Sequence, residues 1–193
     1  MEFDGEKVVN LKTKEEITRK EIGNKVMCSS NAPLSATEAF SSPVSPPPFM
    51  VGIAEVEIDK ETGVVEPIDY AAVVDCGTVV NPNLARVQTE GGIAQGIGMA
   101  LYEDIIYSEK GKNYSNSFMQ YKIPSRLDVG EIRVEFESSY EPTGPFGAKS
   151  IGEIVINTPS PAISNAVQNA VGVIVRELPI TAEKVYKGMA EKE

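Results

Sequence analysis

A single carboxylate ends a segment rich in glycine and proline, Pro142-Thr-Gly-Pro-Phe-Gly-Ala-Lys-Ser-Ile-Gly-Glu153. The glycines permit close backbone approaches and the prolines remove donors, so the segment is neither a central strand nor a helix interior. Lys149 and Glu153 are the only ionisable side chains between Glu141 and Arg176. A constrained loop of this kind could hold Glu153 in a poorly hydrated place, where a carboxylate becomes a base useful near neutral pH. The alternative is a tight surface turn with an incidental glutamate.

A second group that could do chemistry lies on a helix predicted over residues 83–102, where apolar residues recur at spacings of three and four. Gln88, Gly92 and Gln95 stand at i, i+4 and i+7 on one face, with Gly91 beside them. This face offers two amides next to nearly bare backbone, and a flat polar ligand could lie against it. The alternative is that the glutamines are solvated while the glycines pack on a sheet.

Composition and pattern exclude several other kinds of site. The 193-residue chain has no histidine, which rules out histidine triads and histidine zinc sites, and we predict no metal-ligating side chain. Its net charge of -10 argues against nucleic acid as a partner, because phosphate binding needs clustered basic residues. The loop around Lys149 is not a phosphate loop, because that pattern requires glycine where Thr143 and Ala148 stand.

The two cysteines, Cys28 and Cys76, are too few to ligate an iron–sulfur cluster alone and are typical of a reduced, cytoplasmic protein. The N-terminal residues lack the basic and apolar regions of a signal peptide. No stretch approaches the ~20 apolar residues of a membrane span. We therefore expect a cytoplasmic protein with no membrane partner.

The first fifty residues predict little regular structure. A short strand is expected within residues 6–12, and the capping-box pattern Thr13-Lys-Glu-Glu16 predicts a polar helix over residues 14–22. From Cys28 to Phe49 the chain is rich in serine and proline, which indicates a connector or, alternatively, a proline-rich ligand for another domain.

Beyond this connector the pattern alternates between strands and helices. Residues 51–59 and 64–74 predict a hairpin, residues 131–138 a further strand, and Tyr121-Lys-Ile-Pro124 the end of another extended segment. A helix is expected to begin at Thr158-Pro-Ser-Pro161, to carry an apolar stripe as far as Leu178 and to stop at Pro179, with a short Thr181-capped helix after it. The fold class is therefore α+β, with antiparallel strands packed by two main helices.

Five motifs occur in one order along the chain: Asp75-Cys-Gly-Thr-Val-Val-Asn-Pro82, Gln88-Thr-Glu-Gly-Gly92, Gln95-Gly-Ile-Gly98, Tyr121-Lys-Ile-Pro124 and Gly144-Pro-Phe-Gly-Ala-Lys-Ser-Ile-Gly-Glu153. From about Pro47 onward the chain resembles the C-terminal part of the molybdopterin-binding subunit of the xanthine dehydrogenase and aldehyde oxidase family. The resemblance implies a lead segment and connector over residues 1–47 and a C-terminal molybdopterin-binding domain over residues 48–193.

The same resemblance implies molybdenum hydroxylation, in which a glutamate takes the proton from a metal-bound hydroxide whose oxygen comes from water. Glu153 would be this base. The residues matching cofactor contacts are Gln88, Gly91, Gly92, Gly147, Ala148, Lys149 and Ser150, with Gln95 at a more variable position of the family. The implied substrate is a purine or related N-heterocycle, and an aldehyde stays open.

Family members carry this region at the end of a longer subunit. The resemblance therefore implies that the molybdenum–molybdopterin cofactor is shared with a missing portion, and that iron–sulfur clusters and FAD reside on partner subunits. We expect either a small separate subunit or a piece of a larger one, inactive without these partners. Two other readings remain: a non-catalytic assembly domain that keeps the fold, and an unrelated α+β binding module.

Overall fold

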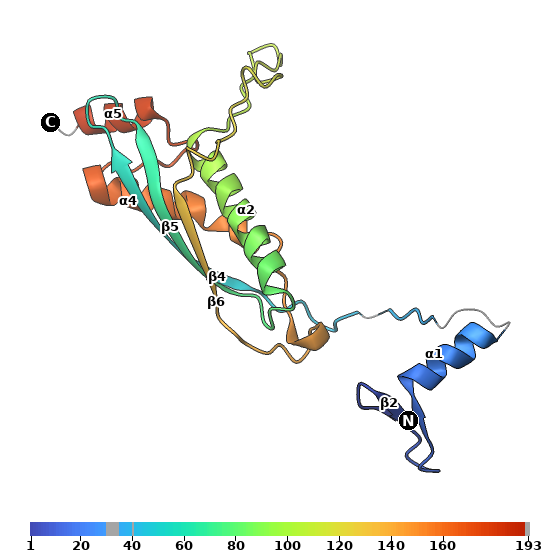
Figure 1. Ribbon diagram of the computed structural model, residues 1–193. Coiled ribbons are helices and arrows are strands. Elements are labelled where there is room, and N and C mark those ends of the chain that lie inside the picture. The colour runs from blue at the N-terminus through green and yellow to red at the C-terminus, as the bar shows by residue number, and fades with distance from the viewer. Residues whose placement is uncertain (30–34, 40, 192–193) are drawn as a thin grey trace. The chain divides into compact units, whose positions relative to one another are not determined.

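The computed structural model describes residues 1–29, 35–39 and 41–191 (Figure 1). Its internal contacts divide the chain into two units, Met1–Ser41 and Ser42–Glu193. The predicted connector over residues 28–49 spans the point of division and lies partly outside the described residues.

The first unit is a small antiparallel sheet followed by one helix. Strands β1 (Glu2–Phe3), β2 (Lys7–Val9) and β3 (Glu16–Thr18) pair in that order, and α1 spans Arg19–Cys28. The helix predicted over residues 14–22 is present only from Arg19 onward, because Glu16 pairs with Val9 in the sheet. The capping box is formed one strand later, by Thr18 and Glu21, which bond each other's backbone N–H groups.

A three-stranded sheet forms the base of the second unit. Strands β4 (Phe49–Ile58) and β5 (Val65–Asp75) form the predicted antiparallel hairpin, and β6 (Glu131–Phe136) is the further strand. The α+β class is confirmed, but β6 runs parallel to β5, so the sheet is mixed rather than wholly antiparallel. The long connection that contains α2 makes the parallel pairing possible, because a hairpin turn cannot join parallel strands.

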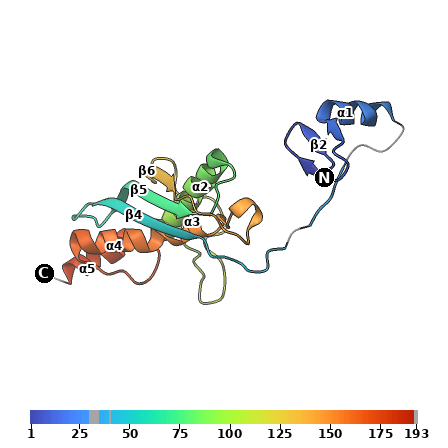
Figure 2. The ribbon, with the colours of Figure 1, turned by 90° about the horizontal axis from the view of Figure 1, so that it is seen from below.

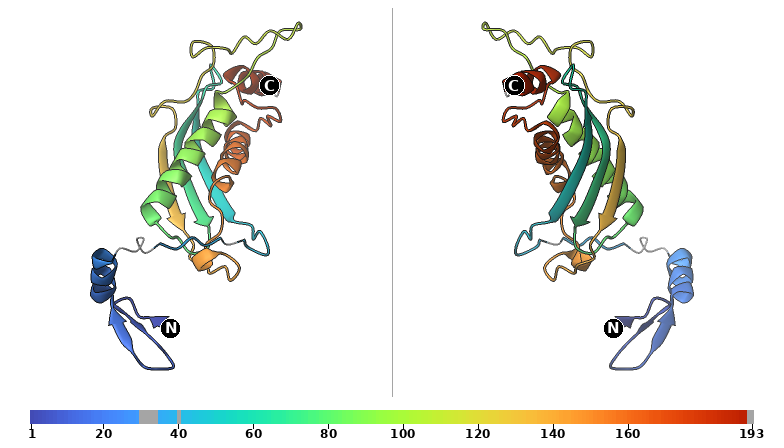
Figure 3. Two further views of the ribbon diagram at one scale, coloured as in Figure 1. Left: turned by 90° about the vertical axis from the view of Figure 1, so that its right-hand side faces the viewer. Right: turned by 90° about the vertical axis from the view of Figure 1, so that its left-hand side faces the viewer.

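Among the described residues of the second unit, helices cover one face of this sheet and none covers the other (Figure 3). The two longest are α2 (Pro82–Leu101) and α4 (Pro159–Val171), which pack against each other, and α4 also packs along β4 (Figure 2). Between the helices and the sheet lies a core that includes Tyr70, Ile93, Ile97, Ile163 and Val167.

Local signals explain where these helices begin and end. The Asn81 side chain accepts from the Leu84 N–H at the start of α2, and Thr181 does the same for Lys184 at the start of α5 (Ala182–Ala190). The apolar stripe predicted as far as Leu178 is wrong, because α4 ends at Val171. Gly172 adopts the left-handed conformation that terminates helices.

Residues 102–130 form a long connection between α2 and β6, and Tyr121-Lys-Ile-Pro124 within it belongs to no strand. This predicted extended segment is therefore wrong. The hydroxyl of Tyr121 donates to the carboxylate of Glu103, and this bond fastens the connection next to the end of α2. Among the described residues, no helix is both long enough and apolar enough to cross a membrane.

The glycines of α2 fall into two kinds, which a pair of substitutions can distinguish. A Cβ on Gly96 would lie 2.6 Å from the Pro159 ring, whereas a Cβ on Gly91 would meet no atom within 4 Å. We predict that Gly96→Ala lowers the free energy of unfolding by about 1–2 kcal/mol through overpacking. Gly91→Ala should raise it by up to about 1 kcal/mol through helix propensity. Urea unfolding monitored by circular dichroism measures both, and equal effects at the two positions would contradict this account.

Candidate functional site

The segment 142–153, called here the glutamate loop, folds back on itself before it reaches Glu153. It contains the short helix η1 (Pro145–Gly147) and leads directly into α3 (Ile154–Asn157). Phe146 and Gly147 both have positive φ, of 55° and 82°. Gly147 is required here, because a Cβ would lie 2.4 Å from the Tyr140 ring and 2.6 Å from the Thr78 hydroxyl.

Backbone hydrogen bonds tie the glutamate loop to the end of β5. The Lys149 N–H donates to the Cys76 carbonyl at 2.7 Å, and the Thr78 N–H donates to the Gly147 carbonyl at 2.8 Å. These bonds extend the strand pairing past β5 and fix the path of residues 147–149. The thiol of Cys76 lies beneath this junction, where burial raises its pKa and keeps it protonated.

An ion pair reinforces the junction. Lys149 Nζ donates to Asp75 Oδ2 at 2.5 Å, and the two side chains are 8% and 22% exposed. Asp75 Oδ1 accepts from the Ser139 hydroxyl at 2.6 Å and from the Gly77 N–H at 3.0 Å. The Lys149 ammonium also lies 5.3 Å from the centroid of the Phe49 ring, within cation–π range. The bonds from Lys149, Ser139 and Gly77 lower the pKa of Asp75 to about 2.

Beyond Lys149 the loop crosses to α2, where it meets the predicted glutamine–glycine face. The Gln88 Nε2 donates to the Gly152 carbonyl at 3.3 Å, immediately before Glu153. A cavity of about 430 Å³ opens here, and we call it the Glu153 cavity. It is lined by Val87, Gln88, Gly91, Gly92, Gln95, Gly152, Glu153 and Ile156.

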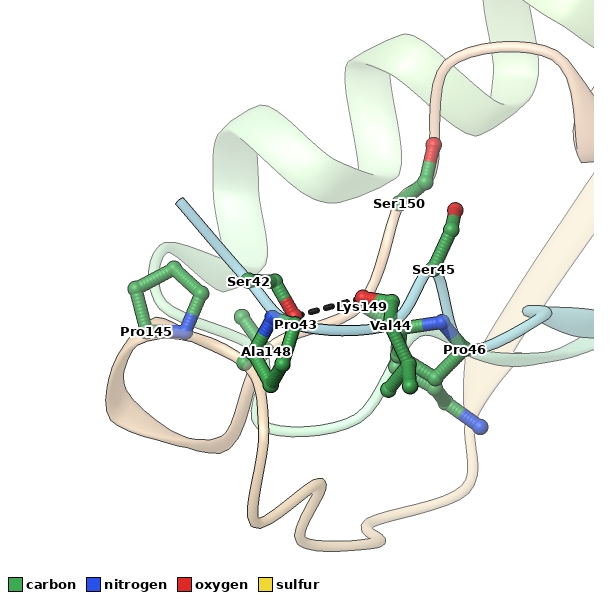
Figure 4. Close-up of a pocket in the computed structure, with 10 residues that line it drawn as sticks. Ser42, Pro43, Val44, Ser45, Pro46, Pro145, Ala148, Lys149 and Ser150 are labelled. Carbon is green, nitrogen blue, oxygen red and sulfur yellow. Dashed lines mark hydrogen bonds between the residues drawn. The ribbon is translucent and has the colours of Figure 1, made fainter. Parts of the chain in front are cut away.

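The structure thus brings five predicted site residues together in one cavity: Glu153, Gln88, Gly91, Gly92 and Gln95. The four residues of the loop lie elsewhere. Ala148 and Lys149 line a second cavity of about 500 Å³ between the loop and the start of α2, which also contacts Gln88 and Gly152. Ala148, Lys149 and Ser150 line a third, of about 560 Å³, whose other wall is Ser42–Pro46 (Figure 4). Gly147 lines none of the three and is buried at the β5 junction.

Two expectations about individual side chains need adjustment. The Lys149 ammonium is engaged by Asp75, so this side chain holds the loop in place. Glu153 is exposed, so the described residues do not supply the poorly hydrated surroundings that the sequence predicted. The two glycines also differ: a Cβ on Gly92 would lie 2.2 Å from Val155, whereas Gly91 faces open space.

Sequence reasoning assigned no role to three residues that position the loop, Asp75, Ser139 and Ser42, although Asp75 begins one of the five motifs. The Ser42 hydroxyl donates to the Thr143 carbonyl at 2.9 Å and so connects the proline-rich segment to the loop. The isolated cation at Lys149 was a signal that an acid must lie near it, but its partner is 74 residues away in sequence.

The sequence of this chain matches a known protein family. The family model described as the molybdopterin cofactor-binding domain matches residues 1–130. This chain belongs to that family of the molybdenum hydroxylases. The match also includes the segment before Pro47, where the motifs resemble the family more loosely.

Individual relatives agree with the family match. The chain is 35% identical over 160 residues to a probable hypoxanthine oxidase, XdhD, of Escherichia coli strain K12, covering 81% of this chain and 16% of that one. Quinoline 2-oxidoreductase from Pseudomonas putida 86 is 37% identical, with a TM-score of 0.67 over 70% of this chain and 18% of that one. Carbon monoxide dehydrogenase from Oligotropha carboxidovorans is 26% identical, with a TM-score of 0.81 over 98% and 25%. The chain thus spans between about a sixth and a quarter of these relatives.

The residues of the Glu153 cavity fit a molybdopterin cofactor. A Cβ at Gly91 or Gly152 would meet nothing within 4 Å, so open space borders bare backbone at both positions. Next to this backbone stand the amides of Gln88 and Gln95, which can donate to and accept from the polar edges of a planar pterin.

The low pKa of Asp75 predicts how stability depends on pH. Because its folded pKa of about 2 lies below the ordinary value of 3.8, the ionised carboxylate stabilises the fold above about pH 4. This contribution is lost as the pH falls from about 4 to about 2. We predict that Asp75→Asn costs about 2 kcal/mol at pH 7, and that the difference from wild type shrinks toward pH 2.

Urea unfolding at several pH values measures this difference. Glu109→Gln, at an exposed position far along the connection, is the control and should match wild type throughout. A deficit of Asp75→Asn that stays constant from pH 7 to pH 2 would contradict the assignment.

Proposed function

We propose that this chain supplies the glutamate side of a molybdenum hydroxylase active site, with Glu153 as the general base. The observation that carries the proposal is the Glu153 cavity, in which a carboxylate, two glutamine amides and exposed glycine backbone lie together. A non-catalytic assembly domain would not need a carboxylate and two amides converging on one cavity.

The molybdenum cofactor, when bound, supplies the oxygen-inserting and electron-accepting chemistry. Glu153 accepts a proton at a carboxylate oxygen, Gln88 and Gln95 bind the polar edge of the pterin, and Gly91 leaves room for it. Lys149 is a positioning residue. Its ion pair with Asp75 fixes the loop, so that the Gly152 carbonyl reaches Gln88 and Glu153 projects from a defined backbone.

The substrate proposed is a purine or a related N-heterocycle. Support comes from the names of relatives, which include a probable hypoxanthine oxidase and a quinoline 2-oxidoreductase. An aldehyde-oxidising member is the second candidate, favoured by structural similarity to an aldehyde oxidoreductase from Desulfovibrio gigas.

The complete enzyme, in this proposal, joins this chain to the rest of a molybdenum-binding subunit and to partners that carry iron–sulfur clusters and FAD. Because Glu153 is exposed here, the remaining portion must cover the cavity and exclude water from the carboxylate. Cys28 and Cys76 are free thiols, which is consistent with a cytoplasmic site of action.

Removing the proposed base gives the first test. In the complex assembled from this chain and its companion segments, Glu153→Gln should lower turnover by about 10²–10⁴-fold or more, because the amide cannot accept the proton. Molybdenum and pterin contents should stay at wild-type levels. Glu109→Gln is the control, and its turnover should be unchanged.

Steady-state turnover and metal analysis of the same preparations decide the outcome. If Glu153→Gln turned over at the wild-type rate with full molybdenum content, Glu153 would not be the base.

Two glutamines on the same helix face provide a second test. Gln88 bonds the glutamate loop as well as lining the cavity, whereas no bond to the loop is recorded for Gln95 among the described residues. Gln88→Leu should therefore lower both pterin content and turnover more than Gln95→Leu does. The lost hydrogen bond alone corresponds to about 1 kcal/mol. Pterin fluorescence after release from the complex measures content, and equal content in Gln88→Leu and wild type would contradict a cofactor contact.

A further inference from the structure

Figure 3 shows the face of the β4–β5–β6 sheet that none of the helices of the second unit covers. At one end, this face carries large apolar side chains that are exposed. Phe49, Val51 and Ile53 on β4 are 61%, 65% and 68% exposed, and Val73 on β5 is 47% exposed. Val51 and Val73 are register partners, so their side chains lie next to each other. The solvated face of a sheet is ordinarily polar, and a contiguous apolar patch on it indicates a binding surface.

Along β6, the same face carries charged side chains. On β6, Glu131, Arg133 and Glu135 are exposed and stand opposite Asp69, Ala71 and Val73 of β5. Arg133 is ion-paired with Asp69, so the uncompensated charge along the β6 border of the sheet is negative.

We call the four apolar residues Phe49, Val51, Ile53 and Val73 the outer patch.

The outer patch is continuous with the support of the glutamate loop. Phe49 is the register partner of Asp75, and its ring lies 5.3 Å from the ammonium of Lys149. A molecule that covers the patch therefore covers one side of the Asp75–Lys149 ion pair. Taking water away from this pair strengthens it electrostatically.

We propose that the outer patch is the docking surface for the portion of the molybdenum-binding subunit that lies outside this chain. The proposal rests on the function proposed above. Carbon monoxide dehydrogenase matches 98% of this chain with 25% of its own length, which leaves about three quarters of that chain to pack around the shared fold. The docking segment is apolar where it meets Val51 and Ile53, and basic where it borders Glu131 and Glu135. Docking there stiffens the loop that presents Glu153.

The test measures assembly separately from turnover. The chain and the polypeptide that supplies the remaining family segments are purified apart and mixed, and their association is followed by analytical ultracentrifugation. Val51→Glu should weaken association about tenfold or more, because a carboxylate would be buried without a partner. Leu127→Glu, at a position 94% exposed and outside the patch, is the matched control and should associate as wild type does. Unchanged circular dichroism and thermal unfolding of each isolated variant show that the fold persists.

Three results overturn the proposal: wild-type association of Val51→Glu, equal weakening by Leu127→Glu, or a wild-type self-dimer that Val51→Glu dissociates. The last would assign the patch to a second copy of the chain. Glu153→Gln serves as the separating arm, because it should associate normally and lack turnover. If Val51→Glu weakens association while Glu153→Gln turns over normally, the docking surface stands and the proposed base fails.

Discussion

The ion pair between Asp75 and Lys149 is the interaction on which the site depends. It joins the end of β5 to the glutamate loop, in which few side chains can form hydrogen bonds or ion pairs. Both partners are partly buried, so desolvation offsets part of their attraction, whereas removal of one partner leaves the other charge unpaired. The geometry of the pair is strict, because Asp75 also accepts from Ser139 and Gly77. The pair therefore acts mainly as a constraint on where residues 147–149 lie, and this fixes the start of the path to Glu153.

A second constraint comes from helix α2, whose glycines allow close packing on one side and leave open space on the other. Gly92 and Gly96 let α3 and the start of α4 approach closely, which compensates for the helix propensity that glycine loses. A Cβ on Gly91 would meet no atom within 4 Å, so open space borders the helix at this position. The same helix thus packs tightly inward and presents open backbone and amides outward. The packing expected for the glycines of this face therefore holds for Gly92, whereas Gly91 leaves the space that the proposed ligand would need.

Local signals made much of the fold predictable, and pairing between distant residues accounts for the errors. The spacing of apolar residues and the capping residues predicted β4, β5, α2, β6 and α5, with bounds within a few residues of those observed. Thr13–Glu16 and Thr18–Glu21 both satisfy the capping-box pattern, and only the pairing of Val9 with Glu16 decides between them. The parallel direction of β6 and the Asp75–Lys149 contact depend in the same way on segments far apart in sequence. The site residues on α2 were found because they share one helix, whereas Asp75 and Ser139 share no element with the loop that they hold.

Glu153 is exposed, although a carboxylate that serves as a base benefits from surroundings with little water. A carboxylate becomes a better base when burial disfavours its charge, and the walls of the Glu153 cavity in this chain leave it open to water. What the chain does fix is direction: the loop is pinned at Lys149, bonded at Gly152 and continued as α3 at Ile154. Positioning the Glu153 carboxylate and excluding water from it are therefore separate requirements, and this chain meets the first. In the proposed function, an exposed carboxylate on a fixed backbone suits a chain that supplies one side of an active site, since a fully buried carboxylate would have no side from which a cofactor held by another segment could approach.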